Sequence, residues 1–209
     1  MEPLASGIVS RMMALIGMKV FTLFALLSAI ALPMTTQAKT ESLVLGGGCF
    51  WCTEAAYEML PGVKSVVSGY SGGKTSKPTY KEIGTGRTNH AEVIKIDFDP
   101  EQVSLATLLD FFWDAHNPTT LNQQGADIGT QYRSIILYAD EAQKAAAIKS
   151  RDAAQETFRD PIVTDIVALE KFWEAEGYHQ DYFANNPNAG YCQYVIAPKI
   201  KKLQKQLGK

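Results

Sequence analysis

Three cysteines stand where thiol chemistry is possible. Cys49 follows three glycines and precedes a helix-forming stretch, residues 50–60, so we expect it at the N-terminal end of a helix. Unpaired backbone N–H groups and the helix dipole at such an end favour a thiolate and lower the pKa of a cysteine below about 8.5. The glycines let the backbone turn sharply and leave the sulfur reachable. Cys49 is therefore the candidate nucleophile, and a buried structural thiol is the alternative.

Two further thiols are candidates for a disulfide with Cys49. Cys52 completes a C-x-x-C pair, a spacing that supports reversible disulfides but closes too short a loop to stabilise the fold much. Cys192 lies in a glycine-bearing segment, residues 188–193, whose mobility would suit a thiol that swings onto another sulfur. Three thiols in an oxidising compartment leave one unpaired, which favours redox cycling over structural disulfides.

Glu92 is the candidate acid. Residues 92–98 alternate as a half-buried strand does, and Glu92 shares a face with Ile94, Ile96 and Phe98. A carboxyl group on a buried face has a raised pKa, which suits a proton donor near neutral pH. The alternative is that the strand begins after Glu92 and that its side chain points into water.

The elements that must position these residues follow the order β-α-β-β-α-β up to residue 139. We expect strands at 42–46, 63–70, 92–98 and 133–139, and helices at 50–60 and from the capping Ser104 to Asn117. This order predicts an α+β fold, a two-layer sandwich with a ferredoxin-like core. A helix from Asp140, a strand within 162–170, a short helical segment at 173–183 and an amphipathic tail at 199–207 follow.

Composition limits the possible functions. The chain has 209 residues, 46% hydrophobic and 20% charged, which suits one compact domain and excludes a disordered chain. A net charge of −2 without a basic stripe argues against a nucleic-acid partner. We expect a monomer that needs no metal or other cofactor.

Residues 1–38 are predicted to be a secretory signal peptide. Arg11 and Lys19 precede an uncharged run of 13 residues, 20–32, and a small-residue site ends at Ala38. The run is short for a membrane-spanning helix of about 20 residues, although an uncleaved anchor is the alternative. The domain at 39–209 is thus expected outside the cytoplasm, secreted across the inner membrane into the periplasm.

Several motifs fall in the order typical of one family. They are GCFW at the start of the expected helix, PGV and SGYSGG after it, PTY at 78–80, HAE at 90–92 and GTQYRS at 129–134. Together they resemble the peptide methionine sulfoxide reductases of the A type over roughly residues 44–198. The resemblance implies a ferredoxin-like core and reduction of methionine S-sulfoxide, free or in proteins, with a thioredoxin-like protein as reductant.

The resemblance also implies roles for individual residues. Cys49 would be the nucleophile that becomes a sulfenic acid, and Phe50 and Trp51 would bind the S-methyl group. Glu92 would protonate the sulfoxide oxygen. Its implied helpers are two phenols and a supporting carboxylate: Tyr80, Tyr132 and Asp127. On pattern alone, the aromatic residues would more simply be read as core residues.

The chain departs from the family pattern at three places. Cys52 stands where the family often has glycine. The thiol that reacts with the sulfenic acid could therefore be Cys52, Cys192 or both in relay. We favour Cys192, because a helical C-x-x-C pair must leave room for substrate. Ala126 stands where asparagine is usual, which weakens the assignment of Asp127. Gln193 and a long basic tail follow Cys192 where the family has an early glycine-rich end. The part of this tail at 199–207 is expected to be a surface helix packed through its apolar residues, Ile200, Leu203 and Leu207.

Two other classes of protein share some of these residues. A thioredoxin-like oxidoreductase would share the C-x-x-C pair, but its proline before a facing strand is missing. A metal-binding module would combine Cys49 and Cys52 with a histidine, although two thiols without a second pair are a weak zinc signal. His116 and His179 are instead expected in solvent at helix ends.

Overall fold

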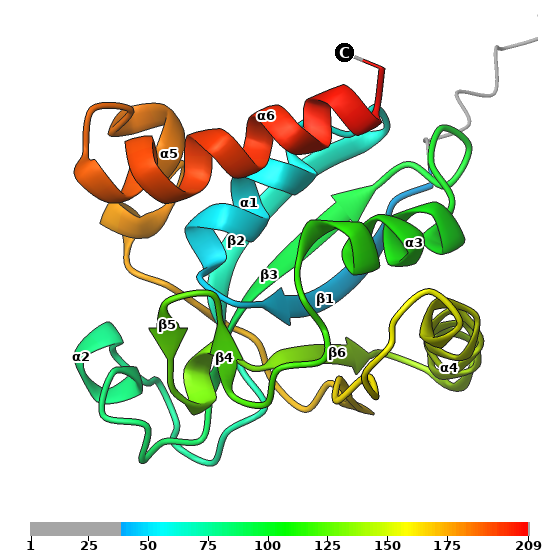
Figure 1. Ribbon diagram of the computed structural model, residues 1–209. Coiled ribbons are helices and arrows are strands. Elements are labelled where there is room, and N and C mark those ends of the chain that lie inside the picture. Colours follow the sequence, from blue (N-terminus) through cyan, green and yellow to red (C-terminus); the bar gives the residue numbers. More distant parts are fainter. Residues whose placement is uncertain (1–38, 209) are drawn as a thin grey trace, which may run out of the picture. The chain divides into compact units, whose positions relative to one another are not determined.

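The computed structural model describes residues 39–208 as a six-stranded sheet with helices packed against one face (Figure 1). The strand order is β7-β6-β1-β3-β2-β8, and every neighbouring pair is antiparallel except β6 and β7. The strands of the sheet are β1 (Glu41–Gly47), β2 (Val63–Ser71), β3 (Ala91–Phe98), β6 (Ser134–Tyr138), β7 (Asp165–Ala168) and β8 (Trp173–Glu174). A separate hairpin pairs β4 (Gln123–Gln124) with β5 (Asp127–Ile128).

Six α-helices are present among the described residues. They are α1 (Phe50–Tyr57), α2 (Tyr80–Ile83), α3 (Leu105–Ala115), α4 (Glu141–Gln155), α5 (Tyr182–Asn185) and α6 (Ala197–Gln206). Short 3₁₀ turns occupy Thr130–Tyr132 and Gly177–His179, and a π-helical turn at Cys192–Ile196 leads into α6. The predicted caps are confirmed, because Ser104 and Asp140 accept hydrogen bonds from backbone N–H groups in the first turns of α3 and α4.

The order of the central strands matches two β-α-β units that interleave. β3 lies between β1 and β2, and β1 lies between β3 and β6, so each helical crossover, α1 or α3, spans one intervening strand. The predicted α+β class, a sheet covered by helices, is confirmed.

Alternation along β3 sends its side chains to two different environments. Its helix-covered face carries Glu92, Ile94, Ile96 and Phe98, and its other face carries Ala91 and Val93. Because Glu92 is 2% exposed, the strand-parity prediction is confirmed and the water-facing alternative is wrong.

Three segments differ from the prediction. No element was predicted between the strands at 63–70 and 92–98, yet α2 lies there and begins with a capping box between Thr79 and Glu82. The expected strand at 162–170 shortens to β7, and the expected helical segment at 173–183 divides into β8, a 3₁₀ turn and the start of α5. The sequence did not predict these elements, since each is too short to show a periodic pattern.

The tail helix α6 packs on the body of the domain beside α1 (Figure 1). Ile200 and Leu203 are buried as predicted, but Leu207 lies past the end of the helix and is 38% exposed. None of the helices within residues 39–208 has the length and apolarity needed to cross a membrane. The predicted signal peptide, 1–38, lies outside the described residues.

Candidate active site

Cys49 lies at the start of α1, as predicted. It is the N-cap residue and follows Gly48, whose φ of 96° lies in the left-handed region that glycine adopts without strain. A Cβ atom at position 48 would also overlap the side chain of Gln124. The Cys49 side chain is 8% exposed, so its sulfur is largely buried and is reached through a pocket.

Cys52 lies one turn further along α1 and shares a hydrogen bond with Cys49. This hydrogen bond is the main cause that lowers the pKa of Cys52 to about 7. The same bond, followed by burial and the charge of Glu92, raises the pKa of Cys49 well above its ordinary value, against an opposing N–H donated by Trp51. The lowered pKa predicted for Cys49 is therefore wrong for the reduced protein. The pair loses one proton near neutral pH, and Cys52 carries the charge.

Cys192 reaches the same region from the C-terminal segment. It is fully buried in the π-helical turn before α6, and burial together with the charge of Cys52 raises its pKa. The expected flexible segment is instead a packed helical turn. The adjacent Tyr191 donates a hydrogen bond to Asp127 Oδ2 at 2.6 Å, and its Oη lies 4.0 Å from Cys52 Sγ. Asp127 thus contacts the thiol side of the site through Tyr191.

Glu92 lies next to the first turn of α1. Its Oε2 accepts a 3.0 Å hydrogen bond from the N–H of Phe50, the residue that follows Cys49. Burial is the main cause that raises the pKa of Glu92 to about 8, and the charges of Asp127 and Cys52 add to the rise. Glu92 is therefore a protonated donor at neutral pH, beside the backbone of the candidate nucleophile.

Two half-buried phenols, Tyr80 and Tyr132, lie where the charges of Glu92 and Cys49 act on them. Tyr80 begins α2 and Tyr132 ends a 3₁₀ turn. Burial, followed by the charge of Glu92, raises the pKa of Tyr80 to about 12 and that of Tyr132 further, and the charge of Cys49 acts on both. Both phenols therefore keep their protons and are hydrogen-bond donors near Glu92.

An aromatic wall of Phe50, Trp51, Tyr80 and His179 borders these groups. The rings of Phe50 and Tyr80 are nearly parallel with centroids 6.4 Å apart, and the His179 ring lies 5.0 Å from Phe50 and 4.3 Å from Tyr80. Trp51 stacks on Tyr182 at 3.6 Å and donates from Nε1 to His179 Nδ1 at 3.2 Å. The wall suits an apolar group that carries sulfur.

The two histidines expected in solvent are buried. His116 does lie at the end of α3, but its ring contacts the Phe112 carbonyl and the Ser134 hydroxyl, each at 2.7 Å, and burial lowers its pKa to about 3. His179 is 1% exposed inside the aromatic wall. The sequence pattern placed both histidines at helix ends, and it could not show that tertiary contacts cover those ends.

Three contributors were missed by sequence reasoning. Glu176 accepts hydrogen bonds from the Tyr80 N–H and the Tyr70 hydroxyl, which fixes the start of α2 against β2. Tyr191 joins Asp127 to Cys52, and Lys199 of α6 lines the pocket that holds Cys49 and Cys52. Only the position of Tyr191 beside Cys192 offered a signal in the sequence.

The assembled site combines a dithiol, a protonated carboxyl group, two phenols and an apolar wall. Such a set suits reduction of a group whose oxygen must gain a proton while a thiolate attacks the atom that carries it. Within residues 39–208, no group of three or more His, Cys, Asp or Glu side chains is placed to hold a metal ion.

Comparison with known proteins agrees with this chemistry. A family model described as "Peptide methionine sulfoxide reductase" matches residues 41–209. The chain is 52% identical to peptide methionine sulfoxide reductase MsrA of Leptospira borgpetersenii over 165 residues, which are 79% of this chain and 94% of that protein. It is 50% identical to MsrA of Acinetobacter baumannii over 163 residues, 78% of this chain and 94% of that one.

Solved structures give the same answer. Reduced Mxr1 from Saccharomyces cerevisiae matches with a TM-score of 0.71 and 35% identity, covering 75% of this chain and 91% of that one. Methionine sulfoxide reductase A of Corynebacterium diphtheriae matches with a TM-score of 0.67 and 35% identity, covering 76% and 80%. This chain belongs to the peptide methionine sulfoxide reductases, MsrA type, and is an oxidoreductase.

Proposed function

We propose that this family member reduces the S epimer of methionine sulfoxide, free or in proteins, through a sulfenic acid on Cys49 and an intramolecular disulfide. The observation that carries the proposal is the buried Glu92, protonated at neutral pH and hydrogen-bonded to the residue that follows Cys49. The epimer rests on the family resemblance.

In the first step Glu92 donates to the sulfoxide oxygen, since a sulfoxide sulfur is a poor electrophile until that oxygen is protonated. Tyr80 and Tyr132 add O–H donors toward the same oxygen. The proton shared within the dithiol moves to Cys52, and the Cys49 thiolate attacks the sulfur. A transient sulfur–sulfur bond forms, and the oxygen then passes from the methionine sulfur to the Cys49 sulfur. The sulfoxide sulfur–oxygen bond and the transient sulfur–sulfur bond break, methionine leaves with its electron pair, and the new sulfur–oxygen bond makes Cys49 a sulfenic acid.

Phe50 and Trp51 hold the S-methyl group during this step. Both belong to the aromatic wall, where a methyl group on sulfur makes favourable contacts with ring faces and edges. His179 fixes the indole of Trp51 by accepting, at Nδ1, the hydrogen bond that Trp51 Nε1 donates. Asp127 supports the thiol side of the site through Tyr191 and lies close enough to Glu92 to raise its pKa.

In the second step we propose that the Cys52 thiolate attacks the sulfenic acid on Cys49 and forms a Cys49–Cys52 disulfide. Cys192 then attacks Cys52 in that disulfide, so that a Cys52–Cys192 bond forms and the Cys49 thiol is released. Cys52 hydrogen bonds to Cys49 and ionises near pH 7, whereas burial raises the pKa of Cys192. The charge of Cys52 also acts on Cys192, which supports a transfer between these two sulfurs. The sequence-based preference for Cys192 thus becomes a preference for a relay.

Regeneration requires an external dithiol, and we propose a thioredoxin-like reductant. The relative Mxr1 has been solved in complex with Trx2. We further propose that the signal peptide exports the enzyme to the periplasm for repair of oxidised proteins, where membrane electron transfer feeds the reductant. Sequencing of the protein recovered from the periplasm should begin at Lys39. An intact N-terminus in the membrane fraction would favour an anchor instead.

The test is single-turnover reduction of the two separated epimers of a methionine sulfoxide peptide by pre-reduced protein. We expect reduction of one epimer, loss of two thiols, and no reaction with Cys49→Ser. Cys52→Ser should accumulate a trappable sulfenic acid, whereas Cys192→Ser should still form one disulfide. Turnover of neither epimer would contradict the proposal, and disulfide formation in Cys52→Ser at an unchanged rate would contradict the order of the relay.

A further inference from the structure

Lys199 places a positive charge in the pocket that holds the dithiol. This pocket, about 170 Å³ in volume, has Cys49, Cys52 and Tyr191 on its wall together with Lys199. Lys199 lies in the first turn of α6, half-buried, and burial lowers its pKa. Within the described residues it forms no hydrogen bond or ion pair. A half-buried ammonium group without a partner is unfavourable unless a nearby anion compensates its charge.

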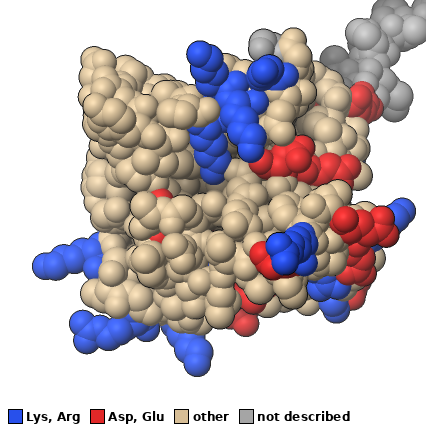
Figure 2. Space-filling model, viewed as in Figure 1, with Lys and Arg blue, Asp and Glu red and all other residues tan. Residues whose placement is uncertain are grey.

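The other lysines of α6 differ from Lys199. Figure 2 shows Lys and Arg side chains gathered at the top of the view, where Figure 1 places this helix. Lys201, Lys202 and Lys205 are exposed, so water solvates their charges. The half-buried Lys199 is therefore the α6 lysine whose charge acts on the interior of the site.

The charges that face Lys199 identify its partner. The negative forms of Cys52, Cys49 and Asp127 attract it, in decreasing order, and Lys202 repels it. Lys199 also lines a second pocket, of about 270 Å³, together with Asp114 and with His116, which is neutral. The groups that act on Cys52 in return are Cys49, Lys199, Tyr191 and Asp127, and Cys52 also acts on Glu92 and Cys192.

We propose that Lys199 is the counter-ion of the Cys52 thiolate when that thiolate forms the disulfide with Cys49. Lys199 is thus a positioning residue of the resolving step. The inference rests on the proposed function, since it assigns the charge that its second step requires.

The Cys52 thiolate needs a nearby cation because the first step removes the thiol that favours it in the reduced protein. While the protein is reduced, the Cys49 thiol is the main group that favours a thiolate on Cys52. Once Cys49 carries oxygen, that thiol no longer exists. Tyr191 cannot replace it fully, because its proton is donated to Asp127 at 2.6 Å while its oxygen lies 4.0 Å from Cys52 Sγ. Lys199 is the remaining group that stabilises the negative charge on Cys52.

The step balances without another reagent. Cys52 loses its proton, and the resulting thiolate attacks the sulfur of the Cys49 sulfenic acid. A sulfur–sulfur bond forms, the sulfur–oxygen bond breaks, and hydroxide leaves and takes up a proton to become water. One thiol and one sulfenic acid thus give one disulfide and one water. Before the attack, the Cys52 thiolate neutralises the positive charge of Lys199. Once the disulfide has formed, Cys52 no longer carries a negative charge to pair with Lys199.

The test compares Lys199→Met with Lys199→Arg, which keeps the charge, and with Lys201→Met, which removes an exposed charge from the same helix. The first measurement is the pH dependence of iodoacetamide alkylation of Cys52 in the reduced full-length protein, read by peptide mass. The second is a single turnover with methionine sulfoxide, in which methionine release and sulfenic acid loss are followed separately with a sulfenic-acid trap.

We expect Lys199→Met to move the alkylation midpoint up by about one pH unit, since a nearby opposite charge shifts a pKa by about 1–3 units. Sulfenic acid loss at pH 7 should slow by about tenfold, which corresponds to that loss of thiolate, while methionine release stays within about twofold. Lys199→Arg and Lys201→Met should resemble the wild type.

An unchanged alkylation midpoint and unchanged sulfenic acid loss in Lys199→Met would overturn the inference. Equal effects of Lys199→Met and Lys201→Met would also overturn it, because the cause would then be general charge. If the wild-type protein released no methionine, the proposed function would fail. The alkylation midpoints would still show separately whether Lys199 stabilises the Cys52 thiolate.

Discussion

The site has two halves that are built differently. The acid half contains Glu92, Tyr80 and the aromatic wall around Phe50, and the thiol half contains Cys52, Tyr191 and Lys199. The acid half depends on β3 and the first turn of α1, which lie in the core of the domain. The thiol half depends on the C-terminal segment that packs onto α1.

The difference separates two chemical tasks. Burial in the acid half raises the pKa of Glu92 to about 8 and holds a proton where an oxygen must receive it. In the thiol half a hydrogen bond and a lysine lower the pKa of Cys52 to about 7, so that a proton is released there. Damage to either half should therefore slow a different step.

The largest effect is expected from Glu92→Gln, which removes the acid but keeps the shape. Methionine release in a single turnover should slow by about 10²–10⁴-fold, the usual contribution of a positioned general acid. The thiol count of the reduced protein should not change. Stopped-flow measurement with the sulfoxide peptide checks this, and equal rates for the two proteins would exclude Glu92 as the acid.

A smaller effect is expected from Leu203→Ala, which removes a side chain that is 1% exposed under α6. Truncation of a buried leucine lowers the free energy of unfolding by about 2–5 kcal/mol. Urea denaturation measures the loss, with the exposed Gln204→Ala as the matched control. Sulfenic acid loss should slow more than methionine release, because α6 carries Lys199. If both steps slowed equally, the two halves would not be separable.

Tyr80→Phe should affect the acid half alone. Loss of one hydrogen bond to a developing charge costs about 1.5–3 kcal/mol, which lowers the rate of methionine release by about 10–100-fold. The Tyr182→Phe variant is the control, since its phenol lies behind Trp51 and outside the donor set. A rate of disulfide formation that fell together with methionine release would place Tyr80 in both halves.

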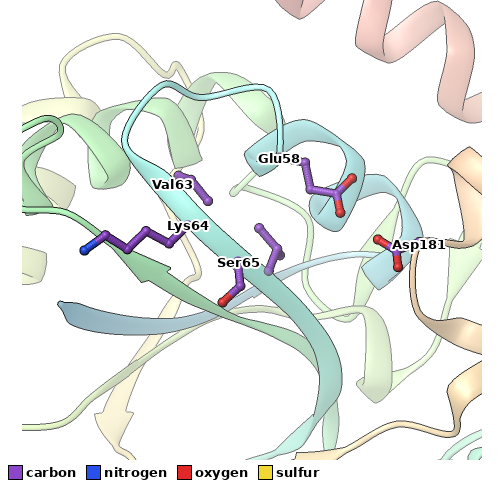
Figure 3. A pocket seen from close by; sticks show the side chains of 6 residues that line it. Glu58, Val63, Lys64, Ser65 and Asp181 are labelled. Carbon is purple, nitrogen blue, oxygen red and sulfur yellow. The ribbon is translucent and has the colours of Figure 1, made fainter.

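The smallest effect is expected outside both halves, in a pocket near the end of α1. There Glu58 and Asp181 point toward each other (Figure 3), and burial, followed by a hydrogen bond between them, raises the pKa of Glu58 to about 7. Because this pKa is above the unfolded value of about 4.3, the contribution to stability is complete below that value and is lost as the pH rises through 7. Glu58→Gln should flatten the pH dependence of urea unfolding between pH 5 and 8, and an unchanged slope would contradict the assignment.

Sequence reasoning predicted the acid half better than the thiol half. Strand parity placed Glu92 on the buried face, and glycines before a helix placed Cys49 at its start, because both positions follow from local geometry. The buried state of Glu92 then follows from the core that surrounds it.

The thiol half could not be predicted in the same way. The lowered pKa expected for Cys49 was wrong because the Cys52 hydrogen bond and burial outweigh the helix terminus. Cys192 was expected in a flexible segment because glycine precedes it, yet packing against the core orders that segment as a helical turn. Lys199 lies 147 positions from Cys52 and 150 from Cys49 in the sequence, and no local pattern encodes their meeting in one pocket.

The central claim is that the first step needs one thiolate and one protonated carboxyl group at the same time. The most direct test is the pH profile of methionine release in a single turnover of the wild-type protein. The account predicts a bell-shaped profile that rises with the dithiol near pH 7 and falls with Glu92 near pH 8, and it predicts that Glu92→Gln loses the falling limb. A rate that keeps rising above pH 9 in the wild-type protein would contradict it.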